Sequence, residues 1–147
     1  MADLLEENEA TRVLASKKRI NQDIRWSKHP GYQQFSVDVL SEEADYEMSL
    51  VGSVTEATGY FKLNLYVGSQ PIAMLHRGKT HHNPNCERLK ASVHKHRWTD
   101  AHRERQAYVP DDIDLSSWET TLRGFLRECN IEFEAQFTPP SVQRRMF

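Results

Sequence analysis

The chain has few of the features that define disulfide-bonded, secreted or membrane-spanning proteins. It contains two cysteines in 147 residues, Cys86 and Cys129, which are no disulfide framework and favour a reducing compartment. No apolar run approaches the length of about 20 residues that a membrane-spanning helix needs. The first residues are acidic, unlike the basic start of a signal peptide. We therefore predict a cytoplasmic protein with no membrane partner.

An excess of charge of one sign is also absent. The 19 Lys and Arg and the 21 Asp and Glu give a formal net charge of −2, so the whole chain has no basic footprint for nucleic acid. Residues 76–105 differ, because eight basic residues stand there against three acidic ones. Any contact with nucleic acid is therefore expected in this segment.

Hydrophobic residues make up 38% of the chain, enough for the core of a single domain over 1–147. Apolar positions between Leu4 and Arg25 follow an imperfect helical period, which predicts a helical segment within 1–30. From residue 33 the period changes to two, which predicts half-buried strands joined by short turns. The predicted strands are 35–39, 46–50, 61–67, 72–75, 92–98 and 106–109.

A second helix is predicted within 113–131. Its start has the pattern of a capping box, Ser116-Ser117-Trp118-Glu119, and an apolar stripe through Leu122 and Phe125 follows. A tail over 138–147 completes the chain. These elements predict an α+β fold: an antiparallel meander sheet of four to six strands over 33–110, with the N-terminal and the C-terminal helix packed on it.

The histidines are clustered in one segment of the chain, since six of the seven lie from His76 to His102. Imidazole exchanges protons near neutral pH and is a common metal ligand. Residues two apart in a strand share a face, so His94 and His96 are expected to face solvent or a cleft. Lys95 is expected to point to the opposite face, so its loss should reduce growth arrest or RNA cleavage much less.

Metal-independent cleavage of RNA is the first chemistry that this cluster predicts. The reaction needs a base for the 2′-hydroxyl proton, an acid for the leaving oxygen, and cations for the phosphate charge. The expected catalytic imidazoles are His81, His94 and His96. Aromatic side chains would stack on bases. The expected substrate-binding residues are Arg77, Lys79, Asn83, Arg97, Trp98 and Tyr108.

Zinc binding and a plain solvated surface are the alternatives. Tetrahedral Zn²⁺ takes Cys and His ligands, and the segment offers His81 or His82, Cys86, His94, His96 and His102. The chain has neither a C-x-x-C nor an H-E-x-x-H pattern. We therefore assign no metal ligand and expect no cofactor, with zinc kept open.

Several short motifs together resemble a family of small uncharacterised bacterial and phage proteins with the pattern G-x-x-H-x-N-P, H-x-H, A-Y-P and C-N-I. The matching segments are Gly78–Pro84, His94–His96, Ala107–Pro110 and Phe125–Ile131, with Pro140 and Gln143 behind them. The resemblance covers roughly residues 63–147. The chain is more distantly similar to a toxin-like family from bacterial toxin–antitoxin operons. Asn85-Cys86 stands where the family pattern has Asp-Gly.

The resemblance places His81, Asn83, Pro84, His94 and His96 on motif positions. Together with the histidine chemistry, it implies a toxin-like or defence-associated protein that acts on RNA as a metal-independent endoribonuclease. Its expected partners are RNA and a cognate antitoxin or other protein. The alternative is a non-enzymatic, phage-encoded or antitoxin-like module that binds a protein or nucleic acid, with or without a His/Cys zinc site.

Overall fold

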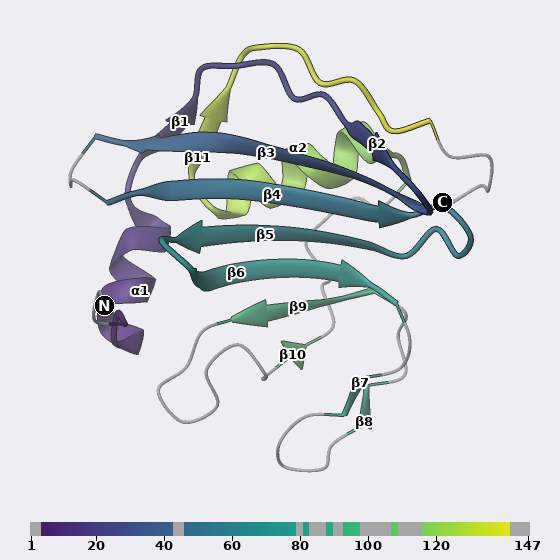
Figure 1. Cartoon of the computed structure of the whole chain (residues 1–147). Helices are drawn as coiled ribbons and strands as arrows, with labels where there is room; N and C mark the ends of the chain where they lie inside the picture. The colour runs from purple at the N-terminus through teal and green to yellow at the C-terminus, as the bar shows by residue number, and fades with distance from the viewer. Residues whose placement is uncertain are drawn as a thin grey trace.

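A curled sheet wrapped around one helix dominates the computed structural model (Figure 1). The structure describes residues 4–42, 46–78, 81–82, 88–89, 93–97, 107–108 and 116–141. For residues 81–82, 88–89, 93–94, 97 and 107–108 it describes the backbone alone.

The described residues form two helices and eleven strands. In chain order these are α1 (Glu7–Ala15), β1 (Lys18–Ile20), β2 (Ser27–His29), β3 (Tyr32–Ser41), β4 (Met48–Thr55), β5 (Phe61–Val67), β6 (Gln70–Arg77), β7 (His81–His82), β8 (Arg88–Leu89), β9 (Val93–Arg97), β10 (Ala107–Tyr108), α2 (Trp118–Glu128) and β11 (Ile131–Phe133). The main sheet runs β10-β9-β6-β5-β4-β3-β1-β11, with β2 paired to β3, and β7 and β8 form a separate pair.

The expected architecture, an antiparallel meander of four to six strands with a helix from each end packed on it, is wrong. The main sheet has nine strands among the described residues. It is mixed, because β11 returns to pair in parallel with β1 at its edge. Strands β3 to β6 do lie where alternation predicts them, but the sheet curls around α2 while α1 lies at one end of it (Figure 1).

The N-terminal helix is shorter than the sequence predicts because Lys18 ends it. The Lys18 ammonium donates to the backbone carbonyls of Val13, Leu14 and Ser16 at 2.7, 2.8 and 2.5 Å. A cation at this position satisfies carbonyls that the helix leaves unpaired and complements its dipole. The chain then turns into β1, and Ile20, which fitted a helical period, packs in the core from a strand.

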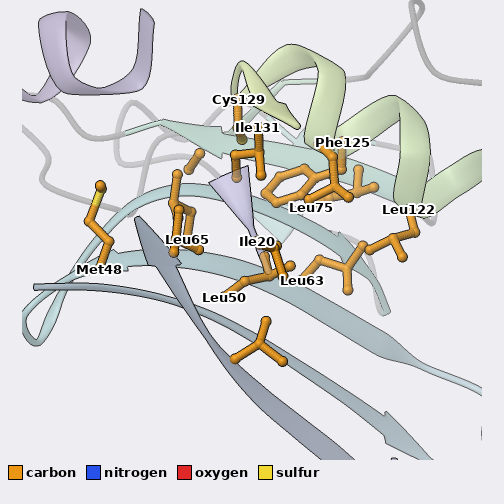
Figure 2. Close-up of a cluster of buried hydrophobic side chains, with 14 of the residues drawn as sticks. Ile20, Met48, Leu50, Leu63, Leu65, Leu75, Leu122, Phe125, Cys129 and Ile131 are labelled. Atoms are coloured by element: carbon orange, nitrogen blue, oxygen red, sulfur yellow. The ribbon is translucent and has the colours of Figure 1, made fainter. Parts of the chain in front are cut away.

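The core lies between the concave face of the sheet and α2. Figure 2 shows Leu122 and Phe125 of α2 directed at Leu63 and Leu75 of the sheet. The helix begins one residue later than its pattern predicts: the Ser117 hydroxyl accepts from the Thr120 amide at 3.1 Å, and the Thr120 hydroxyl accepts from the Ser117 amide at 3.2 Å. This reciprocal cap sets where the apolar stripe of α2 meets the sheet.

Cys129, at the end of α2, is fully buried in this core. Burial raises the pKa of its thiol from 9.0 to about 12, because a thiolate would lose its hydration there. In the unfolded chain the thiol ionises first as pH rises. The stability that the neutral buried thiol contributes is therefore complete below about pH 9 and is lost between about pH 9 and 12.

This linkage predicts a pH-dependent difference between the natural chain and Cys129→Ala. The excess stability of the natural chain is expected to fall by about 1 kcal/mol for each pH unit above pH 9. Urea denaturation of both proteins at pH 8, 9 and 10 measures it. A constant difference across that range would contradict a buried thiol with a raised pKa.

Candidate functional site

The outer face of the sheet, remote from α2, carries a row of polar residues across the strands. Successive pairing registers align Ser27, Gln34, Ser53, Lys62, His76 and the backbone of His94. Leu63 and Leu75, which neighbour Lys62 and His76, are buried in the core on the other face. The alternation of a strand therefore directs Lys62 and His76 outward together.

Two imidazoles meet on this outer face. The rings of His76 in β6 and His96 in β9 lie with centroids 4.7 Å apart and planes at 43°. His96 pairs with Met74, two residues from His76, which brings both rings to one side of neighbouring strands. The main sheet thus forms a histidine pair from segments twenty residues apart in the chain.

A side-chain network orients the His76 ring. Nε2 of His76 lies 2.9 Å from the Asn64 amide oxygen, and the Asn64 amide nitrogen donates to the Tyr66 hydroxyl at 3.1 Å. Since the Asn64 oxygen can only accept, His76 donates through Nε2. In the neutral ring the basic nitrogen is then Nδ1, so Asn64 selects the tautomer that can take a proton there.

The two histidines differ in exposure. His76 is half-buried, whereas His96 is 8% exposed. Of the two expectations for His96, solvent or a cleft, the solvent-facing one is therefore wrong. Met74 beside His96 is also buried, although both lie on the face away from α2. His76, which the sequence analysis counted in the cluster but assigned no role, is the more accessible ring of the pair.

Lys95 occupies the core side of β9, between the two histidines of the H-x-H pattern. Its ammonium lies 2.5 Å from a carboxylate oxygen of Glu128 in α2, with the two side chains 4% and 25% exposed. The pair therefore ties the strand that carries His96 to the helix. Lys95 lies on the buried face of β9, opposite His96, as the alternation predicts. That its loss affects activity less than the loss of a histidine stays a prediction.

Replacing Lys95 with alanine is expected to destabilise the fold by about 2–3 kcal/mol, since it leaves Glu128 without its buried cation. The partial exposure of Glu128 keeps the loss at the lower end of that expected for buried pairs. Urea denaturation measures the loss. The matched control is Lys62→Ala, which removes an exposed lysine from the other face and should change stability by less than about 0.5 kcal/mol.

The main sheet does not gather all the residues predicted for the site. Arg77 pairs with Phe61, a core residue, so its side chain leaves the strand on the face opposite His76. The backbone of His81 belongs to β7, in the separate two-stranded sheet. The backbones of Arg97 and Tyr108 pair with Ala73 and Lys95.

Several other predicted residues belong to segments that the structure does not describe. Lys79, Asn83 and Trp98, and the alternative zinc ligands Cys86 and His102, lie outside the described residues. Within the part of the chain that is described, no three His, Cys, Asp or Glu side chains gather as a metal-binding group.

Sequence reasoning also missed two members of the site, Asn64 and Tyr66. Both alternate with Leu63 and Leu65 along β5 and so face outward. The signal that would have found them is the β5–β6 hairpin, whose Lys62↔His76 and Asn64↔Met74 pairs place Asn64 beside the first histidine of the cluster.

Comparison with known proteins gives a family but no function. Residues 5–131 match the model of a family of unknown function (DUF6978), and the chain belongs to that family. The match includes most of the N-terminal third, which the motif resemblance over residues 63–147 did not use. No curated protein and no solved structure matches the chain. Neither described helix is long and apolar enough to span a membrane.

Proposed function

We propose that this protein acts on RNA by metal-independent histidine acid–base chemistry on the outer face of its sheet, as a toxin-like or defence-associated protein. The observation that supports this most is the His76–His96 pair, together with the hydrogen bond between His76 and Asn64. An imidazole held by a hydrogen bond to one nitrogen is prepared to exchange a proton at the other. The outward-facing Lys62 beside it supplies a cation for phosphate.

In the proposed reaction, Nδ1 of His76 takes the proton of a ribose 2′-hydroxyl. The 2′-oxygen attacks the adjacent phosphorus, the bond from phosphorus to the 5′-oxygen breaks, and an imidazolium protonates that leaving oxygen. We assign the acid role to His94, whose backbone pairs with His76, and keep His81 as the other candidate. His96 acts as a positioning residue that holds the His76 ring.

The test incubates the purified full chain with single-stranded RNA, with and without EDTA, and identifies the new ends. Products with 2′,3′-cyclic phosphate and 5′-hydroxyl ends, formed equally in EDTA, would support the proposal. Cleavage that EDTA abolishes would show that the reaction needs a metal ion and would reject the metal-independent mechanism. Growth arrest on expression of the natural chain, absent for His76→Ala, would support the toxin-like role.

A non-enzymatic binding module is the second candidate, and the burial of His96 at 8% exposure favours it. A buried imidazole next to Lys95, which is ion-paired with Glu128, is also typical of a histidine with a structural role. Absence of cleavage on every RNA tested, together with tight binding of RNA or of a protein, would decide for this candidate.

A further inference from the structure

Two exposed tyrosines lie at one end of the outer face. Tyr32 and Tyr60 are 40% and 37% exposed, and they are among the few exposed large hydrophobic residues of the described chain. The His29 ring stacks on Tyr32 with centroids 4.8 Å apart and planes at 10°. Flat aromatic surfaces at the surface of a sheet are what unpaired bases stack on.

These aromatics adjoin the row that contains His76. Tyr32 pairs with Thr55 of β4, whose amide donates to the Tyr60 carbonyl at 2.9 Å. Tyr60 lies two residues before Lys62, which pairs with His76. Strands β3 to β6 are neighbours in the sheet (Figure 1), and neighbouring strands are about 4.8 Å apart. The registers therefore place the tyrosines, the lysine and the histidine in one continuous patch.

The two ends of the outer face differ in charge. The exposed cation Lys62 stands two residues from Tyr60, whereas Lys28 pairs with the core-facing Gln33 and so lies on the other face. The nearby Glu56 carboxylate accepts a hydrogen bond from buried Gln33 at 3.3 Å. At the opposite end, Asp38 and Glu47 help to line a cavity of about 620 Å³. A polyanion is therefore favoured at the tyrosine end and disfavoured at the acidic end.

We propose that single-stranded RNA binds across this patch, with bases on Tyr32 and Tyr60 and a phosphate at Lys62, so that the chain of nucleotides leads to His76. The proposal rests on the proposed function and names its substrate class and path. Single strands are the occupant because duplex bases are stacked on each other and offer no free face to an aromatic ring. The ammonium of Lys62 then carries part of the salt dependence.

The test measures binding of a fluorescently labelled, fully 2′-O-methylated single-stranded RNA by anisotropy, so that no cleavage can occur. Tyr32→Ala and Tyr60→Ala are each expected to raise Kd at least about fivefold. Tyr32→Phe, which keeps the ring, should bind as the natural chain does. Lys62→Ala should reduce the slope of log Kd against log salt by about 0.7.

Leu40→Ala is the control, because Leu40 is as exposed on β3 but lies at its far end. Natural affinity in both tyrosine variants, tighter binding of a duplex of the same sequence, or no binding of RNA at all would each overturn the proposed path. Because this probe cannot be cleaved, weakened binding in the variants without any nuclease activity would keep the path and reject only the enzyme.

Discussion

Replacing His76 with alanine is expected to slow RNA cleavage by about 10²–10⁴-fold, the range for loss of a general acid or base. The physical reason is that Asn64 holds the His76 ring with Nδ1 as its basic nitrogen, and alanine supplies no group to take the proton. The measurement is the single-turnover rate with saturating single-stranded RNA from pH 5 to 9. A bell-shaped profile in the natural chain, lost in the variant, is the expected result.

Two further variants separate chemistry from positioning. Asn64→Ala keeps the imidazole but removes the hydrogen bond that selects its tautomer, so a smaller loss of rate is expected with KM little changed. His96→Ala should slow the reaction and also lower the thermal midpoint, because the His96 side chain is buried. His76→Ala should leave the midpoint nearly unchanged, since its ring is only half-buried.

The control is Ser36→Ala, an exposed outer-face residue on β3 away from the histidines, which should keep the natural rate. Full activity in the double variant His76→Ala, His96→Ala would reject the assignment of the chemistry to this pair. If that activity disappears in His81→Ala, the chemistry belongs to His81 instead.

The hairpin strands could be predicted from the sequence because each has one face on the core. In β5, for example, Phe61, Leu63 and Leu65 are buried while Lys62 is exposed, so the period of two is plain along the chain. The turn after β5 contains Gly68 at φ 58, a conformation that glycine adopts without strain. Local pattern and local turn agree there, and no long-range contact is needed.

The short strands β1 and β11 could not be predicted in the same way. Each has three residues, too few to establish a period, and their parallel pairing joins residues more than 100 positions apart. Lys18 adds to the difficulty, since it is 1% exposed while lysine is almost always a surface residue. Its partners are carbonyls of the helix that it ends, which only the folded chain brings together.

The sequence identified the cluster of histidines but not how their rings are arranged in space. The count of histidines identified the right segment, yet which rings meet depends on the register between β6 and β9. That register follows a connection of 15 residues, whose path no local pattern determines. The same register directs Lys95 to the core and His96 away from it. Lys95 therefore stabilises the fold, while His96 lies on the face to which we assign the chemistry.

Replacing Phe125 with alanine is expected to lower the free energy of unfolding by about 3–5 kcal/mol. Phe125 is 2% exposed on the face of α2 that meets the sheet. A cavity of only about 10 Å³ lies beside it, lined in part by Ile72, Ala73 and Lys95. Such tight packing leaves the neighbours little freedom to fill the void, so the cavity term adds to the lost burial of the ring.

Urea denaturation of the natural chain, Phe125→Ala and Phe125→Leu measures this. Leucine keeps most of the buried volume and is expected to cost less than about 1.5 kcal/mol, and a loss below about 1 kcal/mol in Phe125→Ala would contradict the packing of α2 on the concave face. Phe125 lies one helical turn before Glu128, which holds Lys95 on β9. Loosening this turn should therefore also weaken the support of the strand that carries His96, and Phe125→Ala is expected to slow any RNA cleavage even under conditions where the variant remains folded.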